Sequence, residues 1–278
     1  MRRLQLVEFE DAPWLPGAIR DGATDLLDLV FDRLGFYHGV AGELASVLDA
    51  TGAHRVVDLC SGGGGGTLAL VTRLRATGRA VELVLSDRFP SASARARVQG
   101  LGDPSTAYLA QPVDAMLGGG DLAGVRTMAS ALHHFAPHDV SAIVAAVVAR
   151  RAPLAFVDVA ASPGLRRLPM FLAPLAMAAN MAVLFVGALL ATPLVRPIRA
   201  DRLLLTYLLP CIPLLVAWDG TVSALRAYAP EELLAAAHAV PGADGYVWNA
   251  GRRGRAVFLT GIPRGPSAEA RQRAGTGD

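Results

Sequence analysis

Residues 54–71 constrain the fold of this chain more than any other stretch. The β-branched residues Val56 and Val57 lead to the carboxylate of Asp58, five consecutive glycines occupy 62–66, and apolar residues resume at helical spacing over 67–71. This order predicts a strand, a tight turn and a helix N-terminus. Glycines in such a turn adopt positive φ and let a ligand approach the main chain, and a helix start attracts carboxylate or phosphate. The stretch therefore predicts a nucleotide-like cofactor.

Two acidic residues bear on which cofactor binds. Asp58 closes the first strand directly before the glycines, and Asp87 closes the next strand, predicted over 81–86. A carboxylate at the second strand end can accept both ribose hydroxyls of a dinucleotide or of adenosylmethionine. Asp58 favours adenosylmethionine, because a carboxylate before the loop can face the methionyl ammonium, directly or through water.

The loop resembles motif I of the class I adenosylmethionine-dependent methyltransferases, an acid followed by alternating glycines. Cys60 stands in the place of the first glycine of that motif. The resemblance implies an α/β fold with a Rossmann-like, seven-stranded sheet. It also implies that S-adenosyl-L-methionine binds at the following residues: Asp58, Ser61, Gly62, Gly63, Gly64 and Asp87.

Alternating strands and helices continue through the chain, as a doubly wound sheet requires. Strands are predicted over 55–59, 81–86, 107–113, 126–130 and 153–160, with helices over 66–77 and 91–100. Two final strands, 245–249 and 255–261, are joined by a glycine-containing loop and predict a hairpin. A terminal antiparallel hairpin is the methyltransferase ending, whereas a dinucleotide-binding domain would continue with parallel strands.

The ends of the third and fourth strands supply further candidates. Asp114 follows the third strand, where related enzymes contact the adenine amino group; its alternative role is that of a solvated loop acid. Ser130 ends the fourth strand and is assigned to the cofactor site. His133 and His134 follow in a Leu-His-His segment that resembles many small-molecule methyltransferases.

These two histidines are the first candidates for catalysis, since imidazole is the usual base near neutral pH. In the family the first histidine commonly lies along the cofactor instead. No other histidine or acid is spaced along the chain to complete a metal site with them, so no metal is expected. The Asn/Asp-Pro-Pro-Tyr signature of enzymes that methylate planar amines is absent, which argues against nucleobase methylation.

Composition excludes several function classes. All 26 basic residues are arginines, which excludes Schiff-base and lysine general-base chemistry. The formal net charge of +2, with acids and bases intermixed, predicts no nucleic-acid partner. Two cysteines without metal-type spacing suggest a reducing, cytoplasmic environment.

Residues 1–50 are expected to form an N-terminal helical cap rather than a signal peptide, because acids interrupt the early apolar residues. Helices are predicted near 26–34 and 41–48. They either pack on the sheet edge or cover the cofactor. In the second case Arg20 would meet the methionyl carboxylate and Trp14 would line the acceptor pocket.

Residues 162–228 interrupt the core, 51–262, with an apolar insertion. The stretch 168–195 has no charged residue, and 203–218 is apolar with two prolines. A membrane-spanning hairpin is disfavoured, because its second arm is short and the arginines between the arms would have to cross the membrane. A helical lid is preferred, which touches one leaflet of a membrane or forms a homodimer interface. The tail, 263–278, is expected to be disordered.

Charge returns abruptly after the apolar stretch, at Trp218-Asp219-Gly220. Asp219 is either the N-cap of a helix that re-enters the core, or a catalytic residue at the pocket rim with Ser223 and Arg226. The Phe-Glu-Asp-x-Pro-Trp start at 9–14, the apolar insertion and Trp-Asp-Gly also resemble a bacterial group of methyltransferases. That resemblance implies no particular acceptor.

The sequence as a whole predicts a cytoplasmic methyltransferase, or one attached to the inner face of the membrane, that acts on a small apolar or lipid-like acceptor. A non-catalytic adenosylmethionine-binding or membrane-associated partner protein is the alternative from another class. A NAD(P)-dependent oxidoreductase is a further alternative.

Overall fold

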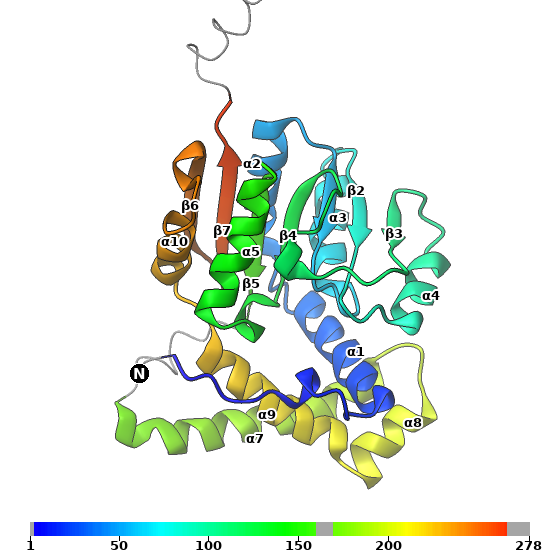
Figure 1. The fold of residues 1–278 in the computed structure, drawn as a ribbon. Coiled ribbons are helices and arrows are strands. Elements are labelled where there is room, and N and C mark those ends of the chain that lie inside the picture. Colours follow the sequence, from blue (N-terminus) through cyan, green and yellow to red (C-terminus); the bar gives the residue numbers. More distant parts are fainter. Residues whose placement is uncertain (1–2, 160–168, 266–278) are drawn as a thin grey trace, which may run out of the picture.

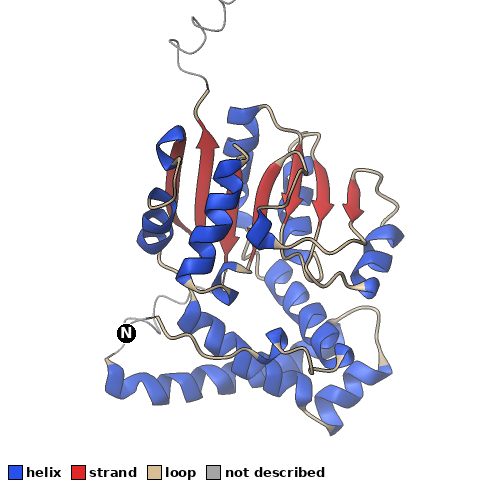
Figure 2. Ribbon diagram, in the orientation of Figure 1, coloured by secondary structure: helices blue, strands red, loops and turns tan. Residues whose placement is uncertain are grey.

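The computed structural model describes residues 3–159 and 169–265, which form a seven-stranded sheet with helices on both faces and a helical layer below it (Figures 1 and 2). The strands are β1 (Arg55–Asp58), β2 (Glu82–Leu85), β3 (Thr106–Tyr108), β4 (Val125–Ala129), β5 (Leu154–Asp158), β6 (Tyr246–Arg253) and β7 (Ala256–Pro263). Their order is β3-β2-β1-β4-β5-β7-β6. The first five are parallel, and β7 runs antiparallel to both β5 and β6. The predicted sheet and its terminal hairpin are confirmed.

Alternation along the strands builds one core on each face of the sheet. Helices α2 (Ala41–Thr51), α3 (Gly65–Ala76) and α4 (Ala92–Gly100) pack on one face, and α5 (Pro137–Ala149) and α10 (Pro230–His238) pack on the other. Successive residues of β1 separate accordingly, because side chains alternate along a strand: Val56 is buried in the first core and Val57 in the second.

The third strand is shorter than predicted. Pairing expected over 107–113 ends at Tyr108, and the chain then turns through Pro112, which has no amide hydrogen for a sheet ladder. Asp114 is therefore not a strand-end residue. It caps the short 3-10 helix η3 (Ala115–Leu117), and its side chain accepts a hydrogen bond from the amide of Met116.

The helical layer covers the edge of the sheet at which the parallel strands end (Figure 1). Its members are the 3-10 helix η1 (Phe9–Asp11), α1 (Gly17–Arg33), η5 (Met170–Leu172), α7 (Ala173–Ala191), η6 (Thr192–Leu194), α8 (Ala200–Leu203), the π-helix Leu204–Leu208 and α9 (Cys211–Arg226). A third core, with Leu26, Ile212 and Val216 among its residues, holds α1 and α9 together. The two helices of the predicted N-terminal cap thus lie in different places. Helix α1 belongs to the helical layer, whereas α2 packs on the sheet.

Of the two roles considered for Asp219, that of the N-cap of a helix is wrong. Helix α9 begins at Cys211 and continues without a break through Asp219 to Arg226, so the apolar arm and the charged segment form one helix. The break lies earlier, where the π-helix and Pro210 place the preceding helical segment at 75° to α9. Residues 160–168, which include the start of the insertion, and residues 266–278 of the predicted tail lie outside the described residues.

Candidate functional site

The loop after β1 has the backbone that a glycine-rich motif requires. Gly62 and Gly64 adopt left-handed conformations with φ of 49° and 84°, and the space above the Cα of Gly62 is open to 4 Å. Cys60, in the place of the first motif glycine, also has positive φ, 62°. A left-handed backbone costs an L-residue roughly 1–2 kcal/mol, so the departure from glycine is strained rather than neutral.

The remaining glycines of the run serve the packing of the cap. A Cβ atom on Gly63 would lie 2.8 Å from Cγ2 of Thr24, and one on Gly66 would lie 2.6 Å from the hydroxyl of Tyr37. A Cβ atom on Gly65 would collide with the carboxylate of Asp28. The glycines therefore let α1 and the segment that follows it, with Tyr37, pack closely against the loop. They also leave room for a ligand at Gly62.

Asp58 lies beneath this loop and is almost completely buried. Its Oδ2 accepts a hydrogen bond from Ser61 Oγ at 2.8 Å, and its Oδ1 accepts one from Thr127 Oγ1 at 3.0 Å. Burial raises the pKa of the Asp58 carboxyl to about 7. The group is thus poised between its neutral and charged forms at neutral pH.

Asp87 lies at the carboxyl end of β2 and faces the same loop. Its Oδ2 accepts a hydrogen bond from the amide of Gly62 at 2.9 Å, and its Oδ1 accepts one from the amide of Phe89 at 2.8 Å. The structure thus brings the two predicted strand-end acids, Asp58 and Asp87, to the same glycine loop.

Three further residues predicted to bind the cofactor, Ser130, Asp114 and Arg20, contact other parts of the protein in the structure. Ser130 has φ of 59°, and its hydroxyl is 2.8 Å from that of Tyr37, so it links the end of β4 to the cap. Asp114 is 3.9 Å from Arg88 and caps η3. Arg20 donates to the carbonyls of Glu10 at 3.1 Å and Ala12 at 2.7 Å, so its guanidinium binds the N-terminal segment, residues 3–15.

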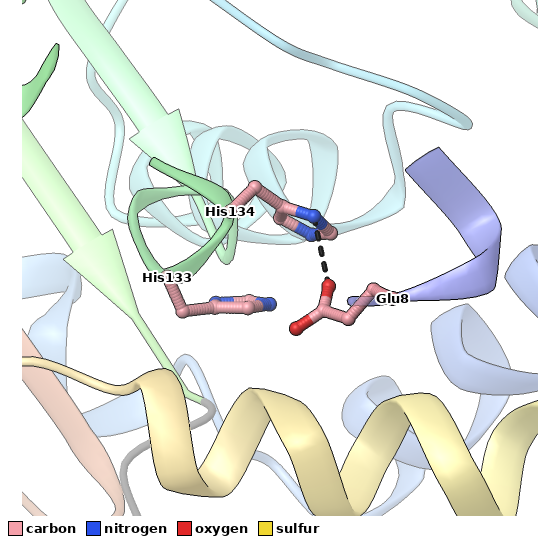
Figure 3. Close-up of side chains that lie close together, drawn as sticks. All are labelled: Glu8, His133 and His134. Atoms are coloured by element: carbon pink, nitrogen blue, oxygen red, sulfur yellow. Dashed lines mark ion pairs between the residues drawn. The ribbon is translucent and has the colours of Figure 1, made fainter. Parts of the chain in front are cut away.

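His133 is a buried residue of η4 (Leu132–His134), the short 3-10 helix that follows β4. Its Nδ1 lies 2.9 Å from Asp158 Oδ2 at the end of β5, and the same oxygen accepts the amide hydrogen of His133. Because the carboxylate accepts from Nδ1, the lone pair of the neutral imidazole is on Nε2. The ring points towards Glu8, on the N-terminal segment (Figure 3).

His134 is held by two carboxylates of the N-terminal segment. Its Nδ1 lies 2.9 Å from Glu8 Oε2 (Figure 3). The same atom lies 2.9 Å from Asp11 Oδ1. Burial opposes the charged forms, but these contacts prevail: they raise the pKa of His134 well above its usual value and lower the pKa values of Glu8 and Asp11. His134 is therefore an imidazolium clamped between two carboxylates at neutral pH.

Helix α9 fixes the N-terminal segment in this position. Asp219 accepts hydrogen bonds from the amides of Phe9, at 2.9 Å, and Glu10, at 2.8 Å, so both its oxygens are used on the main chain. Burial raises its pKa to about 6. On the next two turns of α9, Ser223 Oγ donates to Glu8 Oε1 at 3.1 Å, and Arg226 Nη1 lies 3.4 Å from the same oxygen.

Glu8 and Asp11 are the site residues that the sequence analysis missed. The one signal was a cluster of acids among aromatic residues near the N-terminus. The expectation that no acid could complete a metal site with the histidines is also wrong, since ligand atoms of Glu8, His133 and His134 lie within 4.8 Å of one another. A divalent cation there would have to displace the proton of His134 beside the guanidinium of Arg226, so the local charge disfavours it.

The strand order confirms the predicted fold class. A sheet of order β3-β2-β1-β4-β5-β7-β6 with β7 antiparallel, and a glycine loop after β1, is the arrangement expected from the motif I resemblance. The chain has a Rossmann-like α/β fold. Its strand-end acids and its two histidines meet the helical layer at one edge of this sheet.

Solved structures to which this chain is similar include methyltransferases. Human N-acetylserotonin methyltransferase in complex with adenosylmethionine is 11% identical, with a TM-score of 0.47 over 88% of this chain and 57% of that chain. An O-methyltransferase family 2 protein from Planctomyces limnophilus, in complex with apigenin, is 16% identical, with a TM-score of 0.47 over 91% and 63%. The chain thus spans less than two thirds of these neighbours' length. Searches with protein-family models and against curated proteins find no match.

Proposed function

We propose that this protein is an S-adenosyl-L-methionine-dependent methyltransferase that acts on a small acceptor. One observation carries the proposal: a glycine loop with acids at the ends of β1 and β2 lies at the same sheet edge as a buried histidine–aspartate pair. The first group suits a cofactor with a ribose and a charged amino-acid moiety. The second suits the removal of a proton from an acceptor.

The residues of the loop fit adenosylmethionine. Asp87 would accept the ribose hydroxyls, and the open space above Gly62 leaves room for the cofactor against the main chain. Asp58, in its ionised form, would oppose the methionyl ammonium from beneath the loop. When bound, adenosylmethionine supplies a methyl group that its sulfonium already activates, so the protein mainly has to hold the acceptor and exclude water.

His133 is the proposed general base, and His134 is not. Nε2 of His133 can take the proton of an acceptor hydroxyl or amine, because Asp158 fixes the tautomer and stabilises the imidazolium that forms. His134 already carries its proton between Glu8 and Asp11, so we assign it to holding the N-terminal segment over the site. Asp219 acts through that segment and is a positioning residue.

The acceptor is proposed to be apolar or lipid-like. The layer that covers the site exposes large apolar side chains on its outer face, among them Leu175, Leu190 and Leu208, and such a surface suits an enzyme that takes its acceptor from a lipid phase. We propose that this layer brings the enzyme to a membrane on its cytoplasmic side. A homodimer through 162–228 would bury the same surface and is the alternative.

Ligand binding followed by a turnover assay tests the function. The protein is titrated calorimetrically with adenosylmethionine, adenosylhomocysteine and NAD(P), and then supplied with apolar acceptors. We expect the first two ligands to bind and a methyl group to be transferred. Binding of both without any turnover would favour a non-catalytic adenosylmethionine-binding protein, and binding of NAD(P) alone would favour an oxidoreductase.

A further inference from the structure

We infer that the outer face of α7 and the bend Leu204–Leu209 form one membrane-inserting surface, which lies in the plane of an anionic bilayer without spanning it. The inference concerns how the protein meets a membrane and does not require methyl transfer. Its evidence is the distribution of polar and apolar side chains on α7, the way α7 is tied to α9, and the charge beside the surface.

Helix α7 exposes apolar side chains on its outer face and turns its polar side chain, Asn180, inward. Its most exposed large residues lie along one face: Leu175 (71% exposed), Val183 (69%), Val186 (50%) and Leu190 (72%). Val183 lies about two turns after Leu175, and the last three are spaced three and four positions apart. Asn180, the polar side chain of α7, turns the other way and donates to Thr221 of α9 at 2.9 Å. This is the reverse of a helix on a water-soluble surface and is expected of a helix facing hydrocarbon.

The bend after α8 continues this surface. Leu208 and Leu209 are 72% and 54% exposed. Tyr207, beside them, donates its hydroxyl to the carbonyl of Leu189 on α7, at 2.6 Å, so its polar atom is satisfied within the protein. The same bond ties the bend to α7. Both elements can therefore enter an apolar medium without an unpaired side-chain polar group from these residues.

An in-plane position follows from the packing of α7. With η6 it forms a helix, Ala173–Leu194, that is long and apolar enough to cross a membrane. Its inner side is fixed, however, since Asn180 bonds to α9 and a Cβ atom on Gly220 would lie 2.9 Å from Leu184. Helix α9 in turn leads directly into the core, and α7 runs across the base of the molecule beside it (Figure 1). Spanning would require α7 to leave α9, whereas partial insertion would not.

Charge at the edge of the surface favours an anionic bilayer over a second copy of the chain. Arg196 is exposed and adjoins Ile198, which is 60% exposed, in the loop between η6 and α8. A cation at that level would meet lipid phosphates. Protein interfaces, in contrast, carry about one hydrogen bond per 100–200 Å², and the exposed stripe on α7 consists of leucine and valine side chains.

Vesicle flotation of the full chain tests the inference. We expect it to float with phosphatidylcholine–phosphatidylglycerol vesicles and less with phosphatidylcholine alone. Val183→Asp combined with Leu190→Asp should abolish flotation, and Arg196→Glu should remove the preference for phosphatidylglycerol. Leu101→Asp, at an exposed apolar residue beyond α4, is the matched control and should float like the parent protein.

Three results would overturn the inference. The parent protein could stay unbound to either vesicle. It could form a dimer that the double aspartate variant dissociates, with no flotation, which would assign the surface to a second copy. Tryptophans placed at Leu175 and Leu190 could be quenched by brominated lipids at opposite depths, which would show a spanning helix. Adenosylmethionine affinity of the double variant, measured in parallel, keeps a failure here separate from a failure of the proposed function.

Discussion

Asp158 Oδ2 accepts hydrogen bonds from both the Nδ1 and the main-chain amide of His133, each at 2.9 Å. The carboxylate at the end of β5 thus fixes the ring and the backbone of the residue after β4. Because the carboxylate holds both the ring and the main chain of this residue, the ring is kept from turning away from the site and its Nε2 keeps one direction. This is the arrangement that a general base requires before an acceptor arrives.

Removal of the imidazole should therefore lower turnover without loss of the cofactor. His133→Ala is expected to reduce kcat by about 10²–10⁴-fold, the usual contribution of a positioned base. Asp158→Asn should reduce it less and shift the pH profile of kcat, since it alters only the orientation and basicity of the ring. Steady-state kinetics and calorimetry measure the two effects, with the exposed His54→Ala as control. Full activity of His133→Ala would assign the histidine to packing.

Asp87 offers a direct test of the ribose assignment. Asp87→Ala should weaken adenosylmethionine binding by about 1–3 kcal/mol, through the loss of charge-assisted hydrogen bonds. Gly62→Val should weaken it more, because a β-branched residue resists the φ of 49° and fills the open space above the loop. Calorimetry with the exposed Asp121→Ala as control makes the comparison. An affinity unchanged by Asp87→Ala would refute the assignment.

The buried Asp58 carboxyl predicts a pH dependence of binding. Its pKa is raised to about 7, so in the free protein it carries a proton below that pH. A cationic ligand favours the ionised form, and binding should release a proton. Affinity for adenosylmethionine should therefore increase as the pH rises to about 7. Titrations in buffers of different ionisation enthalpy measure the released proton, and Asp58→Asn should abolish the release.

The raised pKa of Asp58 also predicts how the stability of the protein changes with pH. Between the ordinary aspartate pKa of 3.8 and about 7, the unfolded chain loses a proton that the folded protein keeps. The contribution of Asp58 to stability is thus complete at low pH and is lost as the pH rises through about 7. The difference in unfolding free energy between the parent protein and Asp58→Asn, measured by urea denaturation across this range, should change accordingly. A pH-independent difference would contradict the raised pKa.

Removal of one of the two carboxylates that hold His134 should lower the free energy of unfolding. Glu8→Ala removes the buried carboxylate beside Arg226 and His134 and leaves them the exposed Asp11. Loss of one member of a buried ion pair destabilises a protein by about 3–5 kcal/mol, and the remaining carboxylate should keep the loss at or below the lower end of this range. Urea denaturation should show this loss, whereas Glu231→Ala, at an exposed position in the first turn of α10, should show almost none. Equal stability of the two variants would mean that the N-terminal segment is not held by this pair.

The parts of the site that depend on the sheet could be predicted from the sequence. Asp58 and Asp87 end strands whose order follows from the chain pattern, so their meeting at the glycine loop was foreseeable. The contact of Asp11 with His134 was not, because 123 positions separate them and no periodic pattern links two short 3-10 helices. Asp219 was misplaced for a related reason: an acid after an apolar run looks like a helix start, whereas here it is buried within a helix to bind main-chain amides.

Transfer of a labelled methyl group tests the central claim most directly. The protein is incubated with methyl-labelled adenosylmethionine and a panel of lipidic and other apolar acceptors, and label is counted in the extracted products. We predict transfer to an apolar acceptor by the parent protein, and its loss in Asp87→Ala and His133→Ala. A parent protein that fails to bind adenosylmethionine, or binds it and labels no acceptor, would contradict the account.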